Sequence, residues 1–595
     1  MKKIFGIVGA ILAISAILFF GSRLMKNKGS TGPTHLAVQG TLVLEKSVQA
    51  VEANIEMGGG KVIVTEADSP IVGLEVDVLA NSYKESRDFK ISYSPIASHT
   101  FGEDFTPLTP LISVDNGGGY SDELMEVRIP VKVPADSFAM GFIYDGATKK
   151  LEGLPMIAQD ENSITIATRH FTDFVISMIP FTKLKKDIDT GFRPGMDDWQ
   201  FVNRGSYIAP GGHCAGQSLS SLWYYTEQPD GKDLALYNRY DNNGDKPETP
   251  DLWEDDSLGY RFASTIQQDI DWNGFAFKLW RAQRGVSDDL TWKLFSYSMQ
   301  ITGEPQLVGL TKVGGHAMVA YRVKDGELFI ADPNYPGDLT RRITFAAGKI
   351  DPYESGANFE EIKKGNSTRY DKVGFTGKTT IINWKDIAAR WTEFKNKSIG
   401  RDRFPAYVMI QTDKDGKESS ASDGMTSSAK LININASSQQ ADGIFTNVYR
   451  DEKLLARDAA GNIALVPGNN KLGFAIYGIA DGDPSYIDFK YLNVVFEAGP
   501  NKLSIDPYTV QCVADVPCTF TASIPDASKI KEYVWSITGR EMQRGDSPSF
   551  THTFPKSEYH NITGRAVSVR AYDKDGNVIG EIAGSRATGI ASFVY

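Results

Sequence analysis

The sequence is poor in cysteine and histidine and has no excess of basic residues. Its 595 residues include 3 cysteines and 7 histidines, too few for a disulfide-rich scaffold or a cysteine-rich zinc site. The net charge of −11 argues against a nucleic-acid partner, because such proteins need clustered lysine and arginine. The chain also lacks a P-loop, a dinucleotide-binding fingerprint, an HExxH motif and a GxSxG motif. These absences predict a protein that uses no cofactor and no metal.

An uncharged stretch near the N-terminus predicts a membrane anchor. Lys2 and Lys3 precede residues 4–21, which would span about 27 Å as a helix, close to the roughly 30 Å of a hydrocarbon core. We interpret residues 1–30 as a signal-anchor whose transmembrane helix binds the membrane through residues 4–21, with a cleaved signal peptide as the alternative. Both interpretations predict an extracytoplasmic protein, either anchored at the cell surface or in the periplasm, or secreted.

The rest of the chain predicts a multidomain protein. Hydrophobic residues make up 41% and charged residues 23%, which is typical of globular domains. Short alternating apolar runs predict all-β sandwich domains at residues 35–185, 429–499 and 500–595. Residues 190–411 hold eight of the 9 tryptophans and show helix-like runs before strand-like runs, which is typical of an α+β domain. The small, polar residues of 412–428 predict a linker.

Two of the β segments resemble known surface domains. Residues 142–177 are similar to the closing part of β-sandwich domains of bacterial surface proteins. Residues 500–595, with EYVWSITG and AVSVRAYDKDGNVIGE, resemble immunoglobulin-like domains of the polycystic-kidney-disease type. These resemblances imply a cell-surface ligand for the β-sandwich domains. Within the last segment, Cys512 and Cys518 predict either a disulfide in an oxidising compartment or two buried thiols.

The third cysteine lies in a setting that favours a nucleophile. Cys214 follows a tight Pro-Gly-Gly turn, and the apolar residues Leu219, Leu222 and Trp223 after it have helical spacing. The sequence therefore predicts Cys214 at a helix N-terminus, where the helix dipole and the unpaired N–H groups favour a thiolate.

A histidine and an aspartate follow on two strand-like runs. His316 opens the run HAMVAYRV, and Asp332 and Asn334 end the next run. A three-residue loop with Gly326 in the left-handed conformation would pair His316 with Asn334 and put Asp332 on the same face as His316. A two-residue loop would shift the register by one and put Asp332 on the opposite face. We predict the three-residue loop.

This order of features resembles the papain-like cysteine peptidase superfamily. GGHAMVAY and IADPNYPG look most like the bacterial branch related to double-glycine leader, or bacteriocin-processing, peptidases, over roughly residues 200–345. The resemblance implies an α+β papain-like central domain with Cys214 as nucleophile and His316 as general base and acid. Asp332 would orient the imidazole, and Asn334 is an alternative orienting residue. The implied substrate is a peptide or protein.

One position departs from the family pattern. The superfamily usually has a glutamine about six residues before the cysteine, which donates a hydrogen bond to the oxyanion, and this chain has Ile208 there. Asn203, Ser206 and Gln217 are the alternative polar donors. The sequence therefore leaves two hypotheses: a membrane-anchored extracytoplasmic cysteine peptidase flanked by immunoglobulin-like β-sandwiches, or a surface adhesion or scaffold protein with an inactive papain-like domain.

Overall fold

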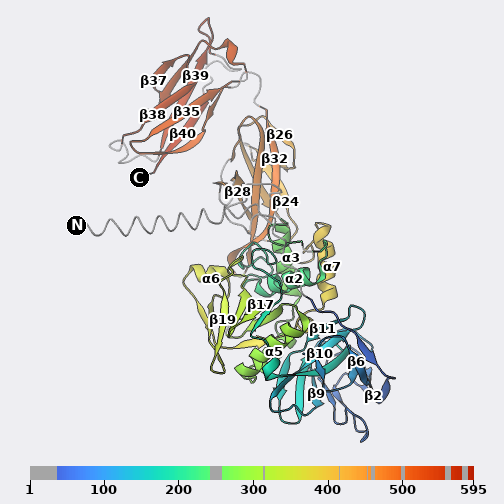
Figure 1. Ribbon diagram of the computed structural model, residues 1–595. Helices are drawn as coiled ribbons and strands as arrows, with labels where there is room; N and C mark the ends of the chain where they lie inside the picture. Colours follow the sequence, from blue (N-terminus) through green and yellow to red (C-terminus); the bar gives the residue numbers. More distant parts are fainter. Residues whose placement is uncertain are drawn as a thin grey trace, which may run out of the picture. The chain divides into compact units, whose positions relative to one another are not determined.

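The computed structural model describes most of residues 37–594 (Figure 1). The residues within that range that it does not describe are 233, 241–256, 313–314, 414–415, 442, 452, 457–462, 481, 498–502, 525, 556–563 and 579–586. The predicted anchor at residues 4–21 lies outside the described residues. Among the helices that are described, none has the length and apolar character needed to cross a membrane.

The chain forms two compact units, and its fold is multidomain and mostly β with some helices (Figure 1). The first unit comprises residues 1–204, 211–240 and 262–399, and the second comprises 205–210, 241–261 and 400–595. The predicted segments 35–185 and 190–411 therefore fall largely into one unit.

The first unit begins with two facing antiparallel sheets. A seven-stranded sheet has the order β11-β10-β14-β8-β5-β2, with β7 paired to β14, and a five-stranded sheet has the order β12-β13-β9-β4-β3. Strands β1 and β6 form a separate pair. The strands are β1 Leu42–Leu44, β2 Val48–Ile55, β3 Gly60–Ile63, β4 Glu75–Val78, β5 Arg87–Ser94, β6 Ile96–His99, β7 Thr106–Pro107, β8 Leu111–Asp115, β9 Met125–Pro130, β10 Ser137–Asp145, β11 Lys150–Gly153, β12 Met156–Gln159, β13 Ser163–Thr168 and β14 Asp173–Pro180.

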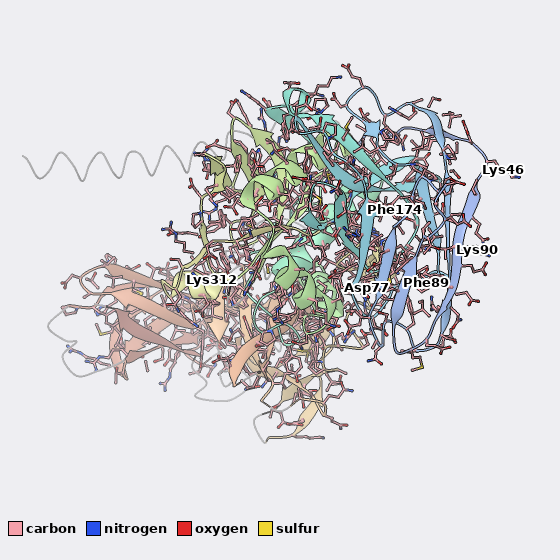
Figure 2. All side chains as sticks on the ribbon, turned by 90° about the horizontal axis from the view of Figure 1, so that it is seen from below. Lys46, Asp77, Phe89, Lys90, Phe174 and Lys312 are labelled. Atoms are coloured by element: carbon pink, nitrogen blue, oxygen red, sulfur yellow. A yellow bond between two sulfur atoms is a disulfide. The ribbon has the colours of Figure 1, made fainter. Side chains whose placement is uncertain are left out.

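The core of this sandwich follows the alternation that the sequence predicts. In β5, Phe89 is fully buried and the next residue, Lys90, is exposed. Figure 2 labels both residues, together with Phe174 on β14. Successive side chains of a strand point to opposite faces, so apolar residues at alternate positions collect between the two sheets.

The central part of the first unit combines helices with one antiparallel sheet. The sheet has the order β20-β19-β18-β17-β16-β23, with β15 paired to β17, and β21 pairs with β22. The helices are η1 Phe181–Lys183, α2 Cys214–Glu227, α3 Ser257–Asp269, α4 Phe275–Gln283, α5 Asp288–Thr302, α6 Phe359–Lys363 and α7 Trp384–Lys395. Of α3, only the residues from 262 onward belong to the first unit. The strands are β15 Asp187–Asp189, β16 Gln306–Leu310, β17 His316–Lys324, β18 Glu327–Ala331, β19 Arg342–Ala346, β20 Lys349–Ile350, β21 Tyr353–Ser355, β22 Thr368–Tyr370 and β23 Val373–Phe375.

Helix α5 joins the sandwich to the central sheet through one hydrophobic cluster. On one side, Tyr297 packs edge-on against Phe142 at 5.3 Å between ring centroids, and its hydroxyl lies 2.8 Å from Ser177 Oγ. On the other side, Phe295 packs against Phe375 at 5.2 Å. A shared core of this kind makes the two predicted domains one packed body.

The hairpin between β17 and β18 differs from the sequence prediction. Lys324 pairs with Glu327, so the loop is the two-residue turn Asp325-Gly326, and both residues have positive φ (49° and 85°) as a type I′ turn requires. A bulge at Tyr321 then shifts the register by one residue. Beyond the bulge the pairing is the predicted one. The prediction of a three-residue loop was therefore wrong. The bulge at Tyr321 produces the strand register that was predicted from that loop.

The second unit contains a sandwich of two sheets around one core. The sheets have the orders β25-β24-β27-β30 and β26-β32-β31-β28-β29. The strands are β24 Val408–Thr412, β25 Glu418–Ser420, β26 Met425–Ser427, β27 Leu431–Ser437, β28 Phe445–Arg450, β29 Lys453–Ala456, β30 Ile463–Ala464, β31 Gly468–Ala480 and β32 Asp483–Phe496. The linker prediction for 412–428 was wrong, because β25 and β26 lie within it and form the edges of the two sheets.

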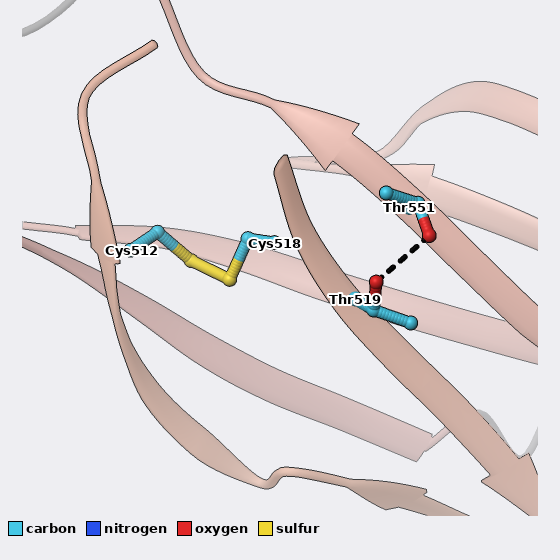
Figure 3. The surroundings of a disulfide bond; sticks show 4 residues. All are labelled: Cys512, Cys518, Thr519 and Thr551. Atoms are coloured by element: carbon cyan, nitrogen blue, oxygen red, sulfur yellow. Dashed lines mark hydrogen bonds between the residues drawn. A yellow bond between two sulfur atoms is a disulfide. The ribbon is translucent and has the colours of Figure 1, made fainter. Parts of the chain in front are cut away.

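The last strands of the second unit form a further two-sheet sandwich. The sheets have the orders β33-β35-β38 and β34-β40-β39-β36-β37. The elements are β33 Ser504–Asp506, β34 Thr509–Val513, β35 Pro517–Ser523, η3 Ala527–Lys529, β36 Glu532–Ile537, β37 Arg540–Gly545, β38 Ser549–Thr553, β39 Gly564–Tyr572 and β40 Ala587–Val594. A disulfide joins Cys512 on β34 to Cys518 on β35 and so links the two sheets (Figure 3). Both cysteines and the fully buried Trp535 belong to the core.

Candidate active site

Cys214 is the first residue of α2 and carries a free thiol. Its side chain is mostly buried, with 8% of the residue exposed. The preceding residue, His213, is the N-cap, and its burial lowers its pKa to about 3, so its ring is neutral. Further along α2, Ser218 Oγ donates to the carbonyl oxygen of Ala317 at 3.2 Å. This contact fixes the first turns of α2 against the start of β17, where His316 lies.

His316 and Asp332 form a buried pair, with 2.7 Å between His316 Nε2 and Asp332 Oδ1. Burial alone would lower the pKa of His316, but the Asp332 carboxylate and, to a smaller extent, the Cys214 thiol raise it to about 10. The other ring nitrogen, Nδ1, is buried and has no nitrogen or oxygen partner in the described part of the chain. The imidazole therefore has one nitrogen committed to the carboxylate and the other available to the thiol.

The Asp332 carboxylate is held by more than the imidazole. Its Oδ1 also accepts the backbone N–H of Asn334 at 2.9 Å, and its Oδ2 accepts the hydroxyls of Tyr353 at 2.8 Å and Ser355 at 3.1 Å. Burial would raise the pKa of Asp332, but His316 and these donors hold it below its usual value. The carboxylate is thus fixed in position and stays ionised.

Asn203 ties together the segments that meet at the site. Its Nδ2 donates to Asn334 Oδ1 and to the carbonyl of Ala357, each at 3.1 Å, and its Oδ1 accepts the backbone N–H of His213 at 2.6 Å. Both amide hydrogens are therefore used within the fold. Asn203 positions the turn before Cys214 and has no hydrogen left to donate to a substrate oxygen.

Asn334, the alternative orienting residue, directs its side-chain hydrogen bonds away from the imidazole. Its Nδ2 donates to Ser355 Oγ at 3.0 Å and to the carbonyl of Gly356 at 2.9 Å. The structure therefore brings Asp332, and not the Asn334 side chain, to His316.

The other two predicted oxyanion donors also point elsewhere. Gln217 Nε2 donates to the carbonyl of Phe201 at 2.8 Å. Ser206 Oγ accepts the backbone N–H of Ala209 at 3.3 Å, in the segment that groups with the second unit. Ile208, in the same segment, packs against the core of the first sandwich of that unit.

Three residues around the pair had no signal in the sequence analysis. Tyr353 and Ser355 bind Asp332 from β21, and Tyr370 on β22 stacks near His316, with ring centroids 6.3 Å apart and planes at 26°. Each of these two strands has three residues, which is too short for a periodic pattern to mark them. Tyr370 is fully buried.

The arrangement has the chemistry of a thiol nucleophile with its base. A cysteine at a helix N-terminus, an imidazole beside it and a carboxylate behind the imidazole are the groups that acyl transfer through a covalent intermediate requires. No group of three or more histidine, cysteine, aspartate or glutamate side chains that could hold a metal ion occurs among the described residues.

Comparisons with known proteins give no family. No protein-family model matches the chain, and no curated protein matches it. Among solved structures, the chain is similar to a Bacteroides ovatus mixed-linkage glucan utilization locus protein, SGBP-B, in complex with a heptasaccharide (11% identity, 29% of this chain and 42% of that chain, TM-score 0.15). It is also similar to domains 4 and 5 of the S-layer protein SbsC, with 10% identity over 32% of this chain and 99% of that chain and a TM-score of 0.11. A structure of SbsC domains 4–9 matches with 8% identity over 93% of this chain and 83% of that chain and a TM-score of 0.14. TM-scores this low carry no argument about function.

Proposed function

We propose that the protein is a membrane-anchored, extracytoplasmic cysteine peptidase whose central domain is papain-like. The observation that carries the proposal is the buried Asp332–His316 pair, whose second imidazole nitrogen is available to a thiol at the start of a helix. The extracytoplasmic location is supported by the apolar segment 4–21 and by the Cys512–Cys518 disulfide, since structural disulfides persist in oxidising compartments. The substrate is a peptide or protein amide.

The chemistry follows from the positions of the three groups. The Cys214 thiolate attacks the carbonyl carbon, and the His316 imidazolium protonates the leaving amine through Nδ1. The neutral imidazole then takes a proton from water, which attacks the thioester and releases the acid. Asp332 keeps the proton of Nε2 in place and stabilises the imidazolium throughout. An amine in place of water would make the same site an acyltransferase.

A surface adhesion or scaffold protein is the second candidate. Two observations favour it: the described chain contains three β-sandwiches, and the site is enclosed, with Cys214 8% exposed and His316 1% exposed. In that case the central domain would be inactive and would only bind.

Alkylation of Cys214 by iodoacetamide separates the two candidates. For a peptidase we expect fast labelling that changes little between about pH 6 and 8 and is slowed strongly in His316→Ala, because the imidazolium stabilises the thiolate. The Cys214→Ser variant gives the background, and mass spectrometry locates the label. Labelling that begins only above about pH 8, or that is equal in His316→Ala, would support the scaffold instead.

A further inference from the structure

The end of α3 caps the helix that carries the nucleophile. Gln267 Oε1 accepts the backbone N–H groups of Ala215 and Gly216, each at 3.0 Å. Both partners are donors, so the oxygen of the amide must face α2 and its NH₂ group must face away. That Nε2 makes no hydrogen bond to any of the residues that the structure describes.

A glycine makes this approach of the two helices possible. A Cβ at Gly216 would lie 1.9 Å from the carbonyl oxygen of Ala263 and 2.9 Å from the backbone nitrogen of Gln267. Any side chain at position 216 would therefore push α3 away from the first turn of α2. The close contact places the Gln267 side chain against the backbone of Ala215, the residue that follows Cys214.

The same end of α3 is also connected to the strand of His316. The Trp272 indole donates to the carbonyl of Gln267 at 2.8 Å, and Trp272 packs against Trp280 with 5.5 Å between ring centroids. A Cβ at Gly315, the residue before His316, would lie 2.8 Å from the Trp280 ring. Gln267 is therefore linked on one side to the cysteine helix and on the other to the histidine strand.

We propose that Gln267 Nε2 is the side-chain donor of the oxyanion hole. This inference rests on the proposed function. When the Cys214 sulfur bonds to the carbonyl carbon, the π electrons move to oxygen, and the resulting oxyanion accepts hydrogen bonds from Gln267 Nε2 and the backbone N–H of Cys214. On collapse the C=O bond re-forms, and the C–N bond breaks as His316 protonates the leaving amine. Gln267 thus performs the role that Ile208 cannot.

Two reactions of Cys214 in the full-length protein distinguish this role from capping. Acylation by p-nitrophenyl acetate passes through an oxyanion, and alkylation by iodoacetamide displaces iodide without one. The Gln267→Glu variant keeps an oxygen for the N–H groups of α2 and removes the donor. Gln267→Leu removes both the oxygen and the donor. The exposed neighbour Gln268→Ala is the matched control.

We expect the ratio of the acylation rate to the alkylation rate to fall about 10²–10³-fold in Gln267→Glu and Gln267→Leu and to stay unchanged in Gln268→Ala. A ratio in Gln267→Glu within about twofold of the wild type would show that the residue only caps α2. A wild type that is alkylated in a His316-dependent way but is not acylated would also overturn the oxyanion assignment. If alkylation itself does not depend on His316, the proposed peptidase fails, and the role of Gln267 fails with it.

Discussion

Replacing Asp332 by asparagine tests whether the imidazole is charged because of the carboxylate behind it. The asparagine is isosteric, and its oxygen can still accept the proton of His316 Nε2 and the backbone N–H of Asn334. Its NH₂ group would face the hydroxyls of Tyr353 and Ser355, which can rotate to accept. The variant therefore keeps the geometry and the tautomer and removes the negative charge.

The expected effect is on the protonation of the pair. Without the carboxylate, burial dominates and the pKa of His316 falls, so the imidazole is neutral at neutral pH. The alkylation rate of Cys214 should therefore fall about 10–50-fold at neutral pH, because the sulfur would then face a neutral ring instead of a cation. Peptide hydrolysis should fall further, by about 10³–10⁴, because the imidazolium is also the acid that protonates the leaving group.

The assay is the pH profile of iodoacetamide labelling between about pH 5 and 9, with urea unfolding as a check on the fold. Asp371→Asn is the control, because Asp371 is an exposed carboxylate next to Tyr370 in the sequence. A labelling rate in Asp332→Asn within about twofold of the wild type at pH 6, with the fold intact, would refute the reasoning.

Three further predictions concern stability. The pKa of His316 is raised to about 10, so its ion pair with Asp332 should stabilise the fold fully below about pH 6.5 and lose that contribution as the pH rises toward 10. The difference in unfolding free energy between wild type and His316→Ala should therefore shrink over that pH range, and a constant difference would contradict the prediction. Gly216→Ala should lower the unfolding free energy by about 1–3 kcal/mol, whereas Gly211→Ala, where a Cβ meets open space, should change it little, and equal urea midpoints for both would count against the close contact. Replacing Cys512 and Cys518 by serine should lower the unfolding free energy of the last sandwich by about 2 kcal/mol, measured by denaturant unfolding. An unchanged denaturant midpoint would argue against the disulfide.

The three candidate site residues, Cys214, His316 and Asp332, each follow a strong local signal in the sequence. A Pro-Gly-Gly turn and helical spacing mark Cys214, and alternating apolar runs mark the strands that carry His316 and Asp332. The register of those strands beyond the bulge was predicted correctly, but from a loop length that the hairpin does not have. Local turn chemistry does not reveal a bulge such as that at Tyr321, because the bulge is set by packing along the hairpin.

Other parts of the structure depend on contacts between segments far apart in the chain. The edge strands β25 and β26 have three residues each, and β25 is exposed throughout, so their sequence resembles a linker although both strands pair with neighbours. The shared core around Tyr297 joins two segments that each have the composition of a separate domain. Tyr353 and Ser355 bind Asp332 from a strand too short to carry a pattern.

The departure at Ile208 has a physical explanation in the division of the chain. The segment 205–210 belongs to the second unit, where Ile208 packs against an apolar core, and a glutamine amide there would be buried at a cost of about 1–3 kcal/mol unless it found partners. A position committed to a core in this way cannot also present a donor to a substrate oxygen. If the site is active, the donor must come from another element, and among the described residues Gln267 has an amide group at the first turn of α2 with its hydrogens unused. Under the proposed function, Ile208 in the core of the second unit and the close approach of α3 at Gly216 would be two parts of one arrangement, in which a donor from a different helix completes the site.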